Sequence, residues 1–387
     1  MHNKVIGSLA VRHRLIISSP LGKRAIKGSP FIQFTRYLHH HVKRSQVKLF
    51  SDTAHKDPPT GPLFDHHNNT FETTTSQGKY GSTEVLNKNL LSDQIPSVEL
   101  AYDVITEHTS QFDKEKSSIV ILHGLFGNKQ NNRTIGRELN ELLERDVYLP
   151  DLRNHGQSPH IGRQDYPSMA LDVERFIQEH IMTHKDAKKP ILVGHSMGAK
   201  VAMSVALRKP ELCSMLVCLD NAPVATPPMN AFPRYVRKLL QIINNPEVNT
   251  VQQADDQLKE VESSVIVRRF LLTVLQRVKD PESGKWRFKS RIPLGILNDA
   301  IVKGNISNWE FNPWVHRFVG PALFIRAIKS HYIADEYLAD VGNFFPNFEV
   351  RDIDAGHWLN AEKPHECVRD IVEFVERHED ELKTVHR

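Results

Sequence analysis

The chain has 387 residues, of which 40% are hydrophobic and 25% are charged, a composition typical of soluble globular proteins. Its net charge of +4 is unevenly distributed: residues 1–50 carry ten Lys and Arg and no acidic residue, which leaves 40 basic and 46 acidic residues in the other 337. This mildly acidic body disfavours a nucleic-acid partner, because a nucleic-acid-binding domain needs a basic folded surface. The longest apolar runs are far shorter than the ~18–20 residues that cross a bilayer, so we expect no integral membrane segment.

The N-terminal segment, residues 1–51, is basic, contains serine and lacks acidic side chains, a pattern typical of a mitochondrial transit peptide. We therefore predict a mitochondrial location; the alternative is a basic tail without a targeting role. Residues 52–93 contain Pro58 and Pro59, a run rich in Thr, Ser and Gly, and few large apolar side chains. This composition predicts a flexible linker.

From residue 94 the chain alternates between short apolar runs and segments with helical periodicity. The runs predict strands at 98–105, 118–122, 147–149, 191–193, 215–219, 322–325 and 348–353. Apolar residues at three- to four-residue spacing predict helices at 133–144, 169–181, 200–209, 336–341 and 364–377. Such alternation predicts an α/β domain over residues 94–387, with a mostly parallel sheet and helices on both faces.

The alternation stops between residues 223 and 317, which are mostly polar with helical patterning. An insertion of this kind predicts a helical cap over the sheet's C-terminal edge, where open α/β sheets bind ligands.

A G-x-S-x-G motif occupies residues 194–198, between the predicted strand 191–193 and the following helix. Its two glycines permit a tight strand-to-helix turn that raises Ser196 above the sheet. This context makes Ser196 the candidate nucleophile. A serine hydroxyl needs a histidine base, which in this arrangement comes last in the chain. His357 follows the predicted strand 348–353 in a small Gly turn, and we expect it to be that base.

The base in turn needs a carboxylate to orient it, and two candidates remain open. Asp220 directly follows the predicted strand 215–219, one strand from the nucleophile. Asp335 lies beyond the strand 322–325, after the loop in which such an acid more often sits. The position of Asp220 at the sheet edge favours it, although it would also suit capping of the next turn.

Acyl transfer also needs two N–H groups that bind the oxyanion. We expect one of them to be the N–H of Met197, which directly follows the nucleophile. The other should be the N–H of Leu125, in the Gly-rich loop after the strand 118–122.

Two further patterns are interpreted as structural. Cys213, Cys218 and Cys367 fit no zinc or redox spacing, so we expect small buried side chains in a reducing compartment. No metal site or bound cofactor is expected. A basic cluster in the cap is interpreted as a solvated helix face, with contact to coenzyme A phosphates as the alternative; its members are Arg268, Arg269, Arg277, Lys279, Lys285, Arg287, Lys289 and Arg291.

Five motifs together resemble the α/β-hydrolase superfamily. They are H-G-L-F-G-N-K-Q-N-N from residue 123, D-L-R-N-H-G-Q-S-P-H at 151–160, G-H-S-M-G-A-K from 194, L-D-N-A-P-V from 219 and A-G-H-W from 355. They are most similar to the mitochondrial branch that includes the yeast ethanol acetyltransferases. In that branch the acid follows the strand after the nucleophile's, which implies Asp220. For the second motif we expect a structural ion pair between Asp151 and Arg153.

The resemblance implies transfer of an acetyl group from acetyl-CoA, as substrate, to ethanol or another small alcohol. Thioesterase and esterase side activities are implied as well. A mitochondrial carboxylesterase or thioesterase that releases acyl groups to water is the alternative. A non-catalytic hydrolase-like binding protein is disfavoured, because nucleophile, base and oxyanion loops are all present. The sequence predicts no oligomeric state.

Overall fold

The computed structural model describes residues 95–109, 116–226 and 231–385. The predicted transit segment and the whole of the predicted linker lie outside these residues. No helix in the described part of the chain is both long and apolar enough to span a bilayer.

Seven strands form one sheet in the order β1-β3-β2-β4-β5-β8-β9. Only β1 runs antiparallel to its neighbour, and the other pairs are parallel. The strands are β1 Tyr102–Ile105, β2 Ile119–Leu122, β3 Val147–Pro150, β4 Ile191–His195, β5 Met215–Leu219, β8 Ala322–Ala327 and β9 Phe348–Ile353. The central strands β2, β4 and β5 are buried throughout, as aliphatic runs covered on both faces must be. The predicted strands are confirmed.

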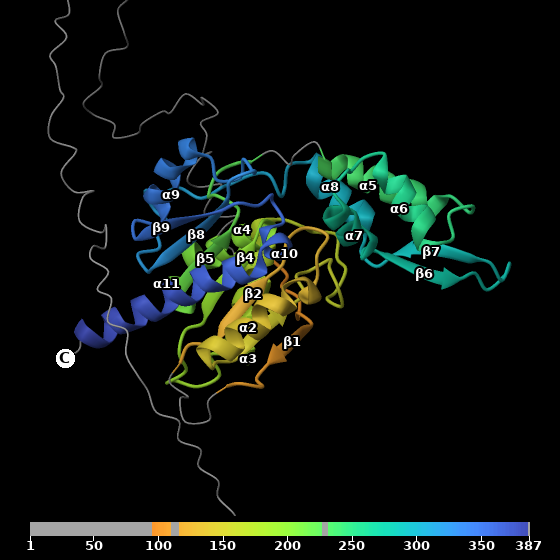
Figure 1. Ribbon diagram of the computed structural model, residues 1–387. Helices are drawn as coiled ribbons and strands as arrows, with labels where there is room; N and C mark the ends of the chain where they lie inside the picture. The colour runs from red at the N-terminus through yellow and green to blue at the C-terminus, as the bar shows by residue number, and fades with distance from the viewer. Residues whose placement is uncertain (1–94, 110–115, 227–230, 386–387) are drawn as a thin grey trace, which may run out of the picture. The chain divides into compact units, whose positions relative to one another are not determined.

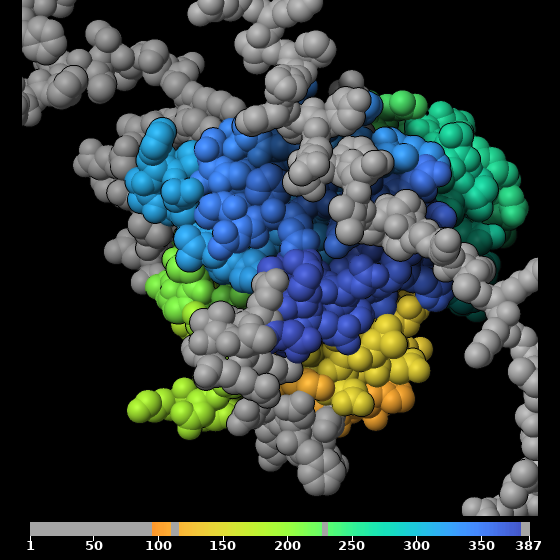
Figure 2. All heavy atoms as spheres, turned by 60° about the vertical axis from the view of Figure 1, so that its left-hand side comes forward, coloured from red at the N-terminus to blue at the C-terminus, as the bar shows by residue number. Residues whose placement is uncertain are grey.

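Helices cover both faces of the sheet, because successive residues in each strand point to opposite sides (Figure 1). One core joins Val120, Leu192 and Leu216 to α3 (Tyr166–His180), α4 (Met197–Arg208) and α9 (Leu338–Phe344). The other core joins Ile121, Val193 and Val217 to α2 (Arg133–Leu143) and α11 (Pro364–Val385). Figure 2 shows the second face, where the dark blue atoms of α11 lie beside the yellow atoms of the region around α2. The predicted α/β architecture is confirmed.

In its described residues, the insertion between β5 and β8 contains four helices, drawn in green and teal in Figure 1. They are α5 Ala231–Asn244, α6 Val251–Lys259, α7 Val265–Leu272 and α8 Leu294–Val302. It also contains an antiparallel hairpin, β6 Leu275–Lys279 with β7 Trp286–Ser290, which the sequence analysis did not predict. The burial of these strands is irregular, so no two-residue alternation marks them. We call this insertion the cap.

Short elements complete the connections. Three are single turns of 3-10 helix, η1 Lys129–Asn132, η2 Pro210–Leu212 and η3 Asp335–Tyr337, and one is the short helix α10 Leu359–Glu362. The three cysteines are free and buried, as expected.

Candidate active site

Ser196 lies in the sharp turn between β4 and α4. Its φ of +54° is in the left-handed region, which a non-glycine residue adopts only when the surroundings hold it there. A Cβ at Gly194 would approach the carbonyl oxygen of Gly198 to 2.2 Å, and one at Gly198 would approach the carbonyl oxygen of Leu122 to 2.4 Å. Both motif glycines are therefore required by close backbone contact. The turn is tied to β5 by a bond from the Ser196 N–H to the Leu219 carbonyl, at 3.0 Å.

The structure brings His357 and Asp220 to Ser196. His357 Nε2 lies 2.8 Å from Ser196 Oγ, and its Nδ1 lies 2.7 Å from Asp220 Oδ2. All three residues are buried, with Ser196 the most exposed at 7%. The ring of Tyr332 stacks on the imidazole with 4.1 Å between centroids. The contacts have the form of a nucleophile, a base and an orienting acid.

Asp220 is held from the strand beside it. Its N–H donates to the Ile325 carbonyl at 2.9 Å, and its Oδ1 accepts the Ala327 N–H at 3.2 Å, so β8 orients the carboxylate. The next turn is capped by Asn221, whose Oδ1 accepts the Ala222 N–H at 3.0 Å. Turn capping is thus carried by the neighbour, and the Asp220 carboxylate is directed at His357.

Asp335 lies elsewhere. It begins η3 with its side chain 86% exposed, and it pairs with Arg326. The structure therefore separates the two acid candidates and places only Asp220 against the imidazole.

The loop after β2 carries Leu125, one of the two predicted oxyanion donors. The next N–H, of Phe126, donates to His155 Nε2 at 3.1 Å, and the Gly127 N–H donates to the Gly124 carbonyl at 3.0 Å. Within the described residues, the N–H groups of Leu125 and Met197 donate to no backbone carbonyl. Leu125, Met197 and Ser196 line the same small cavity. Two backbone donors are therefore available where an oxyanion on an acylated Ser196 would form.

A cavity of about 250 Å³ opens over the nucleophile between the sheet edge and the cap. Ser196, His357 and Trp358 line one side, and Ile266, Arg269 and Phe270 of α7 line the other. A more open cavity of about 930 Å³ adjoins it and shares Arg269, Thr273, Gly127 and Asn131 with it. Ser196 and His357 thus lie at the base of a largely apolar chamber roofed by the cap.

Comparison with known proteins places these features in a family. A family model of the alpha/beta hydrolase fold matches residues 118–364. The chain belongs to the α/β-hydrolase family. It is 52% identical over 304 residues to a "Probable alcohol acetyltransferase" of Saccharomyces cerevisiae, a match that covers 76% of this chain and 88% of that protein. It is 36% identical over 262 residues to the "sn-1-specific diacylglycerol lipase ABHD11" of Xenopus laevis, covering 67% and 79%.

Among solved structures, the "Marine microorganism esterase" has a TM-score of 0.62 and 30% identity, over 72% of this chain and all of that one. The chain therefore belongs to an enzyme family whose members transfer acyl groups or hydrolyse esters.

Three buried histidines form hydrogen bonds with backbone groups around this site, and the sequence patterns predicted a role for none of them. Burial lowers the pKa of His155 to about 3 and those of His123 and His195 to about 4, so all three are neutral at pH 7. His155 Nε2 accepts the N–H of Phe126. His123 Nε2 accepts the N–H of Leu152 at 3.0 Å, and His195 Nε2 lies 2.8 Å from the His357 carbonyl, to which it donates. A neutral imidazole supplies one donor and one acceptor, which fits these bonds.

The H-G pair at 123–124 and the N-H-G run at 154–156 mark two of these histidines in the sequence. Each histidine directly precedes a glycine at the sheet's C-terminal edge. The signal was present, but a pattern of residue types does not show which backbone group a ring nitrogen contacts.

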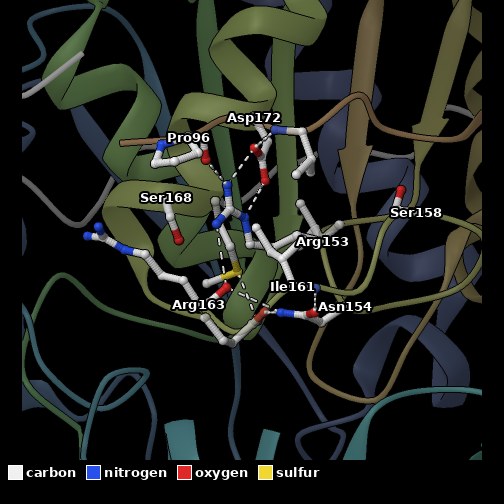
Figure 3. A network of polar contacts seen from close by, with 12 residues as sticks. Pro96, Arg153, Asn154, Ser158, Ile161, Arg163, Ser168 and Asp172 are labelled. Carbon is white, nitrogen blue, oxygen red and sulfur yellow. Dashed lines mark hydrogen bonds and ion pairs between the residues drawn. The ribbon is translucent and has the colours of Figure 1, made fainter. Parts of the chain in front are cut away.

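The prediction that Arg153 pairs with Asp151 is wrong. Arg153 donates to both carboxylate oxygens of Asp172 in α3, at 2.5 and 2.7 Å, and to the Pro96 carbonyl at 3.0 Å (Figure 3). Asp151 instead accepts the Lys129 N–H at 2.6 Å. Asp151 therefore contacts η1 and Arg153 contacts α3, so the two side chains bond to different elements of the fold.

The residues of the basic cluster in the cap have different surroundings. Arg268 is buried and bonded to Asp255, and Arg287 pairs with Asp280. Arg277 stacks over the Trp286 ring at 4.5 Å. Of the eight residues, Arg269 and Arg291 line the open cavity above the site.

Proposed function

We propose that the protein transfers acetyl groups from acetyl-CoA to ethanol or another small alcohol, with thioesterase and esterase side activity. The observation that carries this proposal is the continuous contact from Asp220 through His357 to Ser196 at the base of a covered apolar cavity. The likeness to a protein named a probable alcohol acetyltransferase supports the choice of acyl donor and acceptor.

In the proposed first half-reaction, Ser196 Oγ attacks the thioester carbonyl while His357 Nε2 takes its proton. The tetrahedral oxyanion accepts bonds from the N–H groups of Leu125 and Met197. As the intermediate collapses, the carbon–sulfur bond breaks and the leaving thiolate takes the proton from His357. The product is an acetyl ester of Ser196 and free coenzyme A.

In the second half-reaction, an alcohol hydroxyl gives its proton to His357 and attacks the acetyl carbonyl. The Ser196 ester bond then breaks, and Ser196 regains the proton from the imidazolium. Water in place of the alcohol gives acetate. Asp220 accepts the hydrogen bond from His357 Nδ1 in both halves, which keeps Nε2 free to act as base and stabilises the imidazolium.

Competition between alcohol and water depends on the chamber over Ser196. Ile266, Phe270, Phe232 and Trp358 give it apolar walls, which favour an alkyl group over water. The chamber continues into the larger open cavity, where Arg269 and Arg291 present cationic side chains. Guanidinium groups bind phosphate well, so this cavity suits the phosphates of coenzyme A.

The direct test incubates the full-length protein with acetyl-CoA and ethanol, and measures ethyl acetate, acetate and free thiol together. We expect ethyl acetate to form and acetate to fall as ethanol rises, because both come from one acyl-enzyme. Acetate alone at every ethanol concentration would leave the second candidate, a hydrolase. That candidate is favoured by the relative named as a diacylglycerol lipase and the solved esterase.

We further propose a mitochondrial location, on the basis of the acid-free basic segment at residues 1–51. A fluorescent fusion of the full chain should coincide with mitochondria, and deletion of residues 1–50 should make the signal cytosolic. An unchanged location after the deletion would refute the targeting role.

A further inference from the structure

A second, smaller cavity of about 30 Å³ lies beside the nucleophile. It shares Leu125, Ser196 and Phe232 with the cavity of about 250 Å³ over Ser196, which we call the larger chamber. The small cavity is also lined by Lys200, Tyr166 and Ile306. His357 and Trp358 line the larger chamber, whereas Met197 and Tyr332 line the small cavity.

The position of His357 determines which part of the substrate each cavity can hold. The leaving thiol and the incoming alcohol must both reach His357 Nε2, so they occupy the larger chamber. The acyl carbonyl must face the N–H groups of Leu125 and Met197, and both residues line the small cavity. With the leaving group and the alcohol in the larger chamber, the small cavity is the space left for the acyl chain, and it holds about two water-sized groups.

Lys200 is an unusual wall for such a cavity. It lies on the first turn of α4, where its N–H bonds to the Ser196 carbonyl at 3.2 Å, and it is only 1% exposed. Its Nζ donates to the Val224 carbonyl at 2.8 Å and to Thr226 Oγ1 at 2.9 Å. Within the described residues, no carboxylate forms an ion pair with it. The amine lies 5.5 Å from the centroid of the Tyr166 ring.

These contacts fix the position of the lysine. The two bonds join α4 to the segment leading into the cap, and burial lowers the pKa of Lys200 to about 7. Tyr166 is fixed as well, because its hydroxyl donates to the Ile306 carbonyl at 2.8 Å. An acyl chain that extends toward Lys200 would have to displace an amine already bonded on two sides, or leave it unsatisfied against methylene groups.

We infer that the small cavity is the acyl subsite and that the bulk of Lys200 limits it to acyl groups about the size of acetyl. The inference rests on the proposed acyl-enzyme at Ser196 and adds a residue that determines acyl length. Lys200 acts by filling volume in the wall of the cavity, so an apolar side chain of similar volume would set nearly the same limit.

The experiment compares kcat/KM for p-nitrophenyl acetate, butanoate and hexanoate in the full-length protein and in two variants. Wild type should prefer acetate to hexanoate by at least about tenfold, since each misplaced methylene costs roughly that much. Lys200→Ala should reduce this preference at least about tenfold by opening the cavity. Lys200→Met, which keeps a similar side-chain volume without the charge, should hold the preference within about threefold of wild type.

A second variant keeps the test valid if Lys200→Ala does not fold. Ile306→Ala enlarges the same cavity from another wall and should also shift the preference toward longer chains. Ile266→Ala, in the larger chamber, should change the rates for all three esters together. Circular dichroism and thermal melting check that each variant is folded.

Unchanged acyl preference in both Lys200→Ala and Ile306→Ala would overturn the inference, as would an equal shift in Lys200→Met and Lys200→Ala. These assays measure hydrolysis and do not depend on an alcohol acceptor. Failure to make ethyl acetate would therefore refute the proposed transferase without affecting the subsite. Hydrolysis retained by Ser196→Ala would refute the acyl-enzyme on which both depend.

Discussion

The edge of the sheet and the cap place their polar groups in opposite ways. At the sheet edge, Asp220, His357, His155 and Lys200 are buried, and each has hydrogen-bond partners in the described structure. In the cap, most charged side chains lie at the surface, as with Lys259, whose Nζ lies 2.6 Å from Asp256. The two regions therefore differ in how firmly their polar groups are held: those around Ser196 are bonded inside the protein, whereas most of those in the cap remain in water.

Burial explains why the two regions should respond differently to substitution. A buried polar group that loses its partner bears the full desolvation penalty, of about 1–3 kcal/mol, while an exposed one regains water. Variants at the sheet edge should therefore have large effects on turnover or folding. Substitution of an exposed charged residue in the cap should have a smaller effect, because the group left behind is hydrated.

The largest effect is expected at the nucleophile. Ser196→Ala removes the atom that forms the acyl-enzyme, so ester formation and hydrolysis should both fall, on the order of 10⁶-fold. Both products are measured in one incubation with acetyl-CoA and ethanol. Retention of either activity above a few per cent would show that the two reactions do not share an intermediate at Ser196.

The next effect concerns the acid. Asp220→Asn should lower kcat at least about 10³-fold with little change in KM, because the imidazole loses the charge that stabilises it and fixes its tautomer. Asp335→Asn, at an exposed position, should lower kcat less than about tenfold. Steady-state kinetics of both variants, with folding checked by circular dichroism, decide between them. The reverse pattern would move the acid to the later strand.

A smaller loss is expected from a residue that positions the oxyanion loop. His155→Ala removes the acceptor for the Phe126 N–H and should lower kcat by about 10- to 100-fold, with KM nearly unchanged. His155→Gln, whose side-chain oxygen can accept the same bond, should recover part of the loss. A purely structural role would instead lower the melting temperature of both variants without this rescue of kcat.

Acid should destabilise the fold through the same histidine. Because the pKa of His155 is about 3 in the folded protein and about 6.5 when unfolded, the unfolded chain alone binds this proton between those values. The free energy of unfolding therefore falls as pH falls through 6.5 and below. Between pH 7 and pH 5, wild type should lose about 2 kcal/mol more than His155→Gln.

Urea unfolding at the two pH values measures this difference. Equal losses in wild type and His155→Gln would show that His155 is protonated in the folded protein. His123→Gln provides an independent check, since its buried imidazole should behave in the same sense.

The smallest effect is expected in the cap. Arg269→Ala should raise KM for acetyl-CoA by about three- to tenfold and change p-nitrophenyl acetate hydrolysis much less, because only the first substrate carries phosphates. Arg277→Ala removes an equal charge from the hairpin and serves as the matched control. An equal change in both variants, or an equal change with both substrates, would count against phosphate contact at Arg269.

The sequence by itself determined the elements that depend on local pattern. Aliphatic runs marked the strands, and the glycines of the 194–198 motif marked the strained turn, because close backbone contact leaves no room for side chains there. Strand order along the chain also indicated that Asp220 and His357 would meet at one sheet edge. These features follow from short-range periodicity and from the rule that parallel strands end on the same side.

Only the tertiary structure decided which distant groups pair. Arg153 bonds to Asp172 rather than to Asp151, and the ring nitrogens of His123, His155 and His195 each contact a particular backbone group. A lysine in a helix is usually exposed, yet Lys200 is buried together with the other residues of α4, all twelve of which are buried. Such contacts depend on the packing of elements far apart in the chain, and residue spacing carries no information about that packing.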